Sequence, residues 1–216
     1  MTGDQAVRHL VAADPAWLVL IDRVGPCGLS HESGRTPYEA LMRAIAYQQI
    51  HGRAAEAILG RFLAHFAQAG ESGFPSPRAV LAADPEVLRA CGFSARKVLT
   101  LRGIAEGSVR GLVPGLDEAA ALSDDELVAR LVTLSGVGRW TVEMLLIFTL
   151  GRPDVLPVDD FGVREGWRVL KGLDEQPKPR ALAAVGQDWR PYRSTAAWYL
   201  WRAADLARAG WRPTAA

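Results

Sequence analysis

The stretch Leu134-Ser-Gly-Val-Gly-Arg-Trp-Thr141 decides the fold of this chain, because helix signals flank it on both sides. Upstream, Ser123-Asp-Asp-Glu126 has the spacing of a capping box, in which the serine oxygen accepts an N–H of the first helical turn and the glutamate reaches back. This spacing predicts a helix over about 124–133. Within the stretch, Gly136 and Gly138 allow a tight turn with positive φ and no side chain above the backbone.

A second helix is expected directly after the two glycines, over about 139–150, because apolar residues recur there at helical spacing. Those residues are Val142, Leu145, Leu146 and Thr149. The first N–H groups of this helix, over about 137–140, lie at the positive end of its dipole and suit a phosphate. A two-glycine turn alone is weak evidence, since many helix C-caps also contain glycine.

The motif gains specificity from the residues that follow it. After the apolar helix the chain reads Val155-Leu-Pro-Val-Asp-Asp-Phe-Gly162. The two motifs, in this order and spacing, resemble the helix-hairpin-helix DNA glycosylases, and within them the 3-methyladenine DNA glycosylase II family. The resemblance extends from about Pro37 to Pro213. It implies a repair enzyme that flips a damaged nucleotide out of the duplex and breaks its glycosidic bond.

The composition fits a globular protein, with 49% apolar residues and a net charge of +1. Near-neutrality does not favour DNA binding, but an enzyme that flips one nucleotide needs only a few phosphate contacts. No apolar run approaches the roughly 20 residues of a membrane span, and the N-terminus lacks the apolar segment of a signal peptide. We therefore expect a cytoplasmic monomer with no membrane partner. Cys27 and Cys91 stand far apart without neighbouring His or Cys, which argues against a zinc site or a four-cysteine iron–sulfur cluster.

Helix signals recur along the whole chain, whereas no stretch shows the alternation of a strand, so we predict an all-α protein. Several helix starts consist of an N-cap residue followed by proline, as at Thr36-Pro37 and Ser76-Pro77. Helices are expected near 4–12, 15–24, 37–49, 52–69, 77–82, 85–90, 95–110, 116–121, 124–133, 139–150, 160–170, 179–188 and 192–208, with ends loose by about two to four residues.

The resemblance implies two helical lobes with a cleft between them. On this basis the chain is a single glycosylase unit over 1–216. It would have a middle lobe of about 37–133, a hairpin at 134–138, and a second lobe of about 139–216 joined by the N-terminal helices of 1–36. Many family members also carry an N-terminal β-rich domain, and the roughly 36 residues before the first matching helix are too few for it.

The acidic pair Asp159-Asp160 is the candidate for catalysis, because a carboxylate stabilises the positive charge that develops on a sugar as its base departs. Taken alone, an acidic pair before a helix is more often a structural cap. By the resemblance, Asp160 aligns with the catalytic carboxylate and Asp159 caps or braces the turn. The resemblance also places Trp140, Trp201 and Phe161 in a base pocket. There an indole face attracts a cationic alkylated purine more than a neutral base.

The resemblance implies contacts with the DNA backbone along the hairpin and at the end of the first core helix, where Ala44-Ile-Ala-Tyr-Gln-Gln-Ile50 is similar to a glutamine pair of the family. The residues are Gly136, Val137, Gly138, Arg139, Gln48 and Gln49. The two glutamines alone could equally be caps or solvent-facing side chains. His51 follows them where the family often has a small hydroxyl residue, and it would bring a titratable group near the phosphates. By the resemblance, the carbonyls of Leu134 and Val137 are compatible with a structural Na⁺ or K⁺, and no other cofactor is expected.

The segment Cys91-Gly-Phe-Ser-Ala-Arg-Lys97 matches the part of the family that carries the wedge, the side chain inserted where the target nucleotide leaves the duplex. Intercalating wedges are usually bulky and apolar. Ala95, at the aligned position, is small, so Phe93 or Ser94 would have to take part. The alternative is that Ser94 only caps the helix and Phe93 belongs to the core.

Related glycosylases that also cut the strand carry a nucleophilic lysine at the position that is Trp140 here. We therefore predict a monofunctional glycosylase that excises 3-methyladenine, 7-methylguanine and 1-methyladenine from double-stranded DNA. Two alternatives remain open. A non-catalytic helix-hairpin-helix module would bind DNA but would need no acid at the position of Asp160. A glycosylase for an oxidised base would share the fold and differ in the shape of its pocket.

Overall fold

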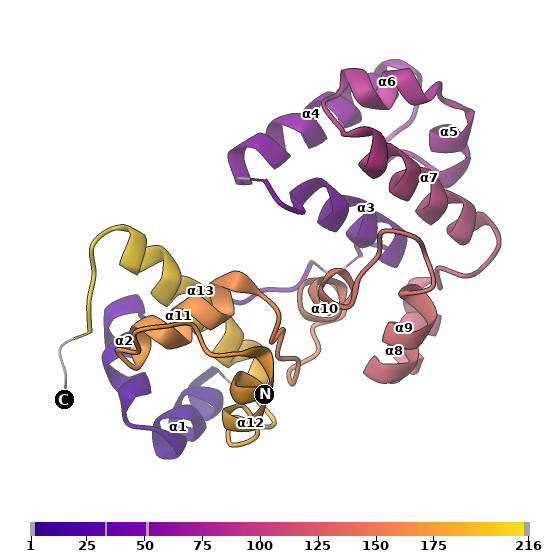
Figure 1. Ribbon diagram of the computed structural model, residues 1–216. Coiled ribbons are helices and arrows are strands. Elements are labelled where there is room, and N and C mark those ends of the chain that lie inside the picture. Colours follow the sequence, from indigo (N-terminus) through magenta and orange to yellow (C-terminus); the bar gives the residue numbers. More distant parts are fainter. Residues whose placement is uncertain (1–2, 33, 51, 214–216) are drawn as a thin grey trace. The chain divides into compact units, whose positions relative to one another are not determined.

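The computed structural model describes residues 3–32, 34–50 and 52–213, and this part of the chain consists of helices joined by loops and turns (Figure 1). Its helices are α1 (Gly3–Ala13), α2 (Ala16–Val24), α3 (Pro37–Tyr47), α4 (Gly52–Gln68), α5 (Pro77–Ala82), α6 (Pro85–Ala90), α7 (Ala95–Val109), α8 (Leu116–Ala121), α9 (Asp124–Leu131), α10 (Arg139–Phe148), α11 (Phe161–Leu170), α12 (Pro179–Val185) and α13 (Arg193–Arg208). The all-α prediction is confirmed for these residues. No helix among them is long and apolar enough to cross a bilayer.

The helix starts follow the capping signals of the sequence. The hydroxyl of Thr36 accepts the N–H of Glu39 at the start of α3, and the hydroxyl of Ser76 accepts that of Ala79 at the start of α5. At α9 both halves of the capping box around Ser123 form. Because each cap satisfies an orphan N–H of the first turn, these starts agree with the predicted ones to within one or two residues.

The chain divides into two compact units. The terminal unit contains Met1–His31 and Gly151–Ala216, and the middle unit contains Glu32–Leu150. The sequence predicts that the hairpin and the helix after it lie outside the middle lobe, whereas in the structure both belong to the middle unit. The physical reason is packing, since α10 lies against α3 and α9, and the hairpin lies against α7.

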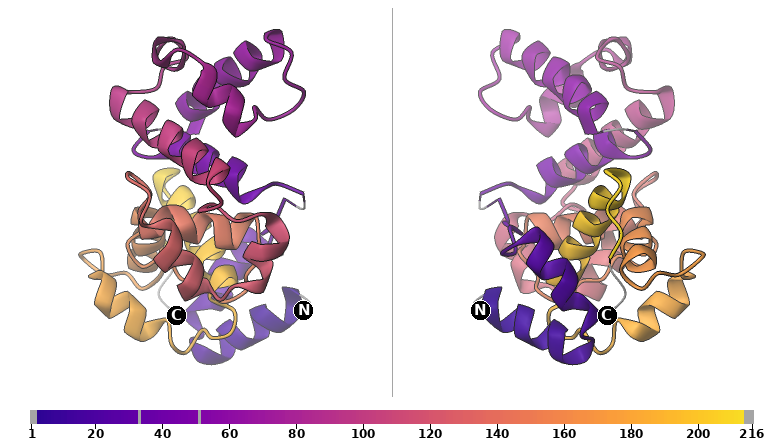
Figure 2. Two further views of the ribbon diagram at one scale, coloured as in Figure 1. Left: turned by 90° about the vertical axis from the view of Figure 1, so that its right-hand side faces the viewer. Right: turned by 90° about the vertical axis from the view of Figure 1, so that its left-hand side faces the viewer.

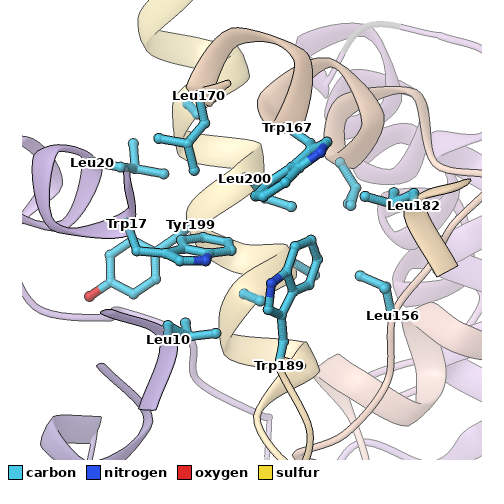
Figure 3. Packing of buried hydrophobic residues seen from close by; sticks show 14 residues of the cluster. Leu10, Trp17, Leu20, Leu156, Trp167, Leu170, Leu182, Trp189, Tyr199 and Leu200 are labelled. Carbon is cyan, nitrogen blue, oxygen red and sulfur yellow. The ribbon is translucent and has the colours of Figure 1, made fainter. Parts of the chain in front are cut away.

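The terminal unit combines helices from the N-terminal and C-terminal parts of the chain around an aromatic core. Its helix α2 packs against α11 and α13 (Figures 1 and 2). Figure 3 shows Trp17, Trp167 and Trp189 at its centre, with the Trp17 and Trp189 ring centroids 5.2 Å apart in an edge-to-face arrangement. Tyr199 and Leu200 of α13 are fully buried beside them. This core fixes α11 and α13, the two helices that carry the acidic and aromatic candidates.

The middle unit has its own core, in which α3 packs against α4, α7 and α10. Three rings pack around Phe62: its centroid lies 5.0 Å from that of Phe66 and 5.8 Å from those of Phe74 and Phe93. Leu101 and Ile104 of α7 are completely buried. This packing gives the hairpin a rigid support on the side of α7.

Candidate functional site

The hairpin runs from the end of α9 to the start of α10 in the middle unit. The N–H of Val137 donates to the carbonyl of Leu134 at 3.0 Å and closes the turn. Gly136 has φ +83°, and a Cβ there would lie 2.1 Å from the Oγ1 of Thr100, so the close approach to α7 requires glycine. At the start of α10, the N-cap Gly138 makes no side-chain cap hydrogen bond. The predicted turn between two helices is therefore present, with the N-terminus of α10 following directly after it.

The glutamine pair after α3 has two different roles. The Nε2 of Gln48 donates to the Oγ1 of Thr141 at 3.0 Å and to the carbonyl of Gly136 at 3.4 Å. Gln48 therefore orients the hairpin from within the middle unit. Gln49 is exposed and has φ 56°, an unusual value for a residue other than glycine. His51 lies outside the described residues.

Lys97 secures the end of α3. Its Nζ donates to the carbonyls of Ala46 at 3.0 Å and of Gln48 at 2.8 Å. Partial burial lowers the pKa of this amine. Because the ammonium group is bound to two carbonyl oxygens, its evident role is to satisfy the last carbonyls of a helix.

The segment predicted to carry the wedge is mostly structural. Phe93 is only 4% exposed and packs edge-on against Phe62 in the core of the middle unit. Phe93 is therefore not available as a wedge in this structure, which corrects that prediction. The hydroxyl of Ser94 accepts the N–H of Lys97 at 3.3 Å and caps α7, whereas Ala95 is exposed at the first position of that helix. The alternative reading of Phe93 and Ser94, as core and cap, describes both residues.

Asp160 in the terminal unit is the N-cap of α11, and its Oδ1 accepts two hydrogen bonds. One comes from the N–H of Val163 at 2.8 Å and the other from the indole Nε1 of Trp201 at 2.8 Å. The sequence assigns the cap to Asp159, but in the structure Asp160 caps the helix and Asp159 is exposed in the preceding turn. Phe161, the next residue, is 69% exposed.

The loop that leads to Asp160 is held by a cluster of charged side chains. The Nη2 of Arg193 donates to the carbonyl of Asp154 at 2.8 Å. Its Nε also donates to the carboxylate of Asp154 at 2.7 Å, and Arg190 approaches the same carboxylate to 3.1 Å. The hydroxyl of Ser194 donates to the carbonyl of Arg152. No local signal pointed to Asp154, because its partners lie about forty positions further along the chain.

The aromatic candidates lie in both units. Trp140 is half-buried on α10 of the middle unit. Trp201 is half-buried on α13 of the terminal unit and packs against its hydrophobic core. The bond from Trp201 to Asp160 was not foreseen, since it joins residues 41 positions apart.

A pocket of about 520 Å³ lies beside the hairpin within the middle unit. Leu134 and Ser135 line it together with the last turns of α7 and α9. Arg130 at its wall donates to the carbonyls of Gly111 and Leu112 and pairs with Glu118. This arginine therefore braces the loop behind the hairpin.

Among the described residues, no group of three or more His, Cys, Asp or Glu could hold a metal ion. Cys27 and Cys91 are single free cysteines, and burial raises the pKa of both thiols. An alkali cation at the hairpin would have to use backbone oxygens.

Known proteins share both the sequence and the architecture. A family model described as HhH-GPD superfamily base excision DNA repair protein matches residues 42–191. DNA-3-methyladenine glycosylase 1 of Schizosaccharomyces pombe is 44% identical over 204 residues, which cover 94% of this chain and 88% of that protein. The solved structure of 3-methyladenine DNA glycosylase (Mag1) from the same yeast, in complex with abasic DNA, matches with a TM-score of 0.84 at 44% identity and covers 92% of this chain and 95% of that one. DNA-3-methyladenine glycosidase from Bacillus halodurans matches with a TM-score of 0.79 at 31% identity and covers 96% of this chain and 92% of that one.

Proposed function

Because this chain belongs to the HhH-GPD superfamily of base excision DNA repair proteins, we propose that it is a monofunctional DNA glycosylase that excises alkylated purines and leaves an abasic site. The observation that carries the proposal is the carboxylate of Asp160, which the first turn of α11 and the indole of Trp201 hold in a fixed orientation. A fixed anion of this kind suits a reaction in which positive charge develops on a sugar.

The substrates proposed are 3-methyladenine, 7-methylguanine and 1-methyladenine. Two similar proteins, from Schizosaccharomyces pombe and Bacillus halodurans, are named for activity on 3-methyladenine, which supports this class of lesion. The indole of Trp140, next to the hairpin, would favour a cationic alkylated purine over a neutral base by about 1 to 2 kcal/mol where water is excluded. Phe161 is an exposed ring beside the acid and would take part in base recognition.

The proposed reaction needs little acid catalysis. An N-alkylated purine already carries positive charge, so it departs as a neutral base when the glycosidic bond breaks. The positive charge then passes to the sugar, where the carboxylate of Asp160 stabilises it until a water molecule adds. Extrusion of the nucleotide costs a few kcal/mol and is easiest where the lesion has weakened pairing.

The absence of strand cleavage is proposed from the position of the lysines. Trp140 stands where lyase relatives carry their nucleophilic amine, as the resemblance implies. Lys97, the one lysine in the sequence of residues 32–150, donates to the carbonyls of Ala46 and Gln48. An amine held in this way is a poor candidate for a Schiff base.

The proposed partner is double-stranded DNA with a damaged base, bound by a monomer. The backbone of the hairpin, over Gly136–Arg139, would hold a phosphate at the N-terminus of α10, and Gln49 would add a polar contact. The carbonyl of Leu134 accepts one N–H and retains a second lone pair, so it and the carbonyl of Val137 suit an alkali cation. Such an ion would supply positive charge at the phosphate.

The test is incubation with DNA treated with a methylating agent, followed by chromatography of the released bases. We expect free 3-methyladenine and 7-methylguanine from the natural protein, and release that is slower by roughly 10² or more from Asp160→Asn. Binding to methylated DNA without release would indicate a non-catalytic module. Release of an oxidised base, such as 8-oxoguanine, without release of alkylpurines would indicate the other alternative. Borohydride should trap no covalent complex, and a trapped adduct would refute the monofunctional assignment.

A further inference from the structure

Helices α11 and α13 touch where α11 has no side chain. Gly162 and Gly166 are four residues apart and share one face of α11. A Cβ at Gly166 would lie 1.9 Å from the carbonyl oxygen of Leu200, so the backbones of the two helices are in direct contact there. This close approach sets the position of the next residue along α13, which is Trp201.

Gly162 leaves the space that the indole occupies. A Cβ at this position would lie 2.8 Å from the Cδ1 of Trp201 and 3.2 Å from the Oδ1 of Asp160. The edge of the indole therefore passes over Gly162 and brings its N–H to the carboxylate at 2.8 Å. The two glycines thus have one combined effect, which is to allow an aromatic donor on α13 to reach the N-cap of α11.

The resulting hydrogen bond constrains the carboxylate from a second direction. The N–H of Val163 comes from the helix that Asp160 caps, and the N–H of Trp201 comes from a different helix. A hydrogen bond to an ionised acceptor is shorter and roughly twice as strong as one between neutral groups. Because the ring of Trp201 also packs against the core of the terminal unit, its donor is rigidly placed.

We propose that Trp201 is a positioning residue for Asp160: its indole N–H, admitted by Gly162 and Gly166, fixes the carboxylate that stabilises the sugar cation. This inference rests on the proposed function of Asp160. It differs from the role that the resemblance implied for Trp201, which was to form a wall of the base pocket. A wall contributes mainly to binding of the base, whereas a positioning donor contributes to the rate of bond cleavage.

Trp201→Phe separates the two roles, because it keeps an aromatic ring and removes the N–H. We expect the single-turnover rate of 7-methylguanine release to fall by roughly 10- to 100-fold, the loss of one hydrogen bond to a charged group. The enzyme concentration that gives half of the maximal single-turnover rate, which reports binding of the lesion, should stay within about 2-fold of the natural protein. The matched control is Trp198→Phe on the same helix, whose indole packs against Gly28, and its rate should be unchanged.

A spectroscopic test does not depend on activity. The indole ¹⁵N–¹H resonance of Trp201 is identified by its loss in Trp201→Phe, and it should move in Asp160→Ala, which removes its acceptor. Gly162→Ala keeps the indole and displaces it, so it should move the same resonance and lower the same rate. This variant also tests the proposal if Trp201→Phe fails to fold.

The outcomes separate this inference from the proposed function. An unchanged rate in folded Trp201→Phe, or weaker substrate binding with an unchanged rate, would overturn the positioning role while base release continued to support the function. An indole resonance whose chemical shift does not change in Asp160→Ala would also overturn the positioning role. If the natural protein releases no base and the resonance still moves in Asp160→Ala, the proposed function fails while the hydrogen bond stands.

Discussion

Asp160→Asn should separate the two roles of this side chain, because its structural role tolerates an amide and its proposed chemical role does not. As an N-cap, Asp160 accepts the N–H of Val163, and asparagine caps helices about as well as aspartate. The amide oxygen can also accept the N–H of Trp201. We therefore expect the free energy of unfolding to fall by less than about 1 kcal/mol. The rate of base release should fall by roughly 10² or more, which is about 2.7 kcal/mol of transition-state stabilisation.

Two further variants supply the controls. Asp160→Ala removes the cap as well as the charge, so it should cost about 1 kcal/mol of stability and reduce the rate at least as much as asparagine does. Asp159→Asn changes an exposed residue of the turn and should leave both quantities close to those of the natural protein. Stability is measured by urea unfolding, and the rate by single-turnover release of 7-methylguanine with enzyme in excess. Affinity for abasic duplex should change little in any variant.

The reasoning is refuted if Asp160→Asn folds and excises at a near-normal rate. It is also refuted if the rate follows stability across the three variants, with asparagine close to the natural protein and alanine far below it. That pattern would mean that Asp160 serves only as a cap.

Three further predictions concern other parts of the structure. Gly138→Ala should fold normally, because Gly138 has φ −94° and no atom lies within 4 Å of an added Cβ, but it should weaken binding to all DNA sequences alike. Gly136→Ala should also lose about 2 kcal/mol or more of stability. An unchanged DNA affinity of folded Gly138→Ala in a fluorescence titration would contradict the phosphate site. Trp140→Ala should reduce release of 7-methylguanine more than release of neutral hypoxanthine, measured on matched oligonucleotides, and equal loss of both would assign the indole to packing. Burial, with a smaller effect of Cys27, raises the pKa of Tyr199 from 10.0 to about 12. The stability that the neutral hydroxyl contributes is therefore complete below pH 10 and is lost as the pH rises from 10 to 12. The midpoints of urea unfolding should fall over this pH range, and they should fall less in Tyr199→Phe.

Local signals in the sequence were sufficient to locate the helices. The capping oxygens of Ser94 and Ser123 act on N–H groups three residues away, so both cause and effect are visible in one short stretch. The same is true of Gly136, whose positive φ follows from the need to turn between two helices. Features of this kind require no knowledge of distant parts of the chain.

Features that depend on distant residues were predicted less well. Phe93 follows a glycine and precedes a helix, a setting that fits a wedge as well as a core residue, and only its partner Phe62 decides between them. The membership of α10 in the middle unit likewise depends on its packing against α3, which no local pattern contains. Hydrophobic burial has no direction along the sequence, so the pattern of apolar residues shows that a helix is buried but not against what.

Asp160 depends both on nearby residues and on a distant one. Its chemical role could therefore be proposed from the sequence, whereas its hydrogen bond to Trp201 could not be predicted. The sequence predicts an acidic cap before this helix but assigns it to Asp159, whereas the N–H of Val163 donates to Asp160, three residues before it. The second donor arrives from 41 residues away, and it can do so only because Gly166 lets the backbone of α13 approach. A glycine within a helix costs roughly 1 kcal/mol relative to alanine. Gly162 and Gly166 therefore lower the intrinsic stability of α11. We infer that the contact they permit, the hydrogen bond from the indole N–H of Trp201 to the carboxylate of Asp160, offsets this loss.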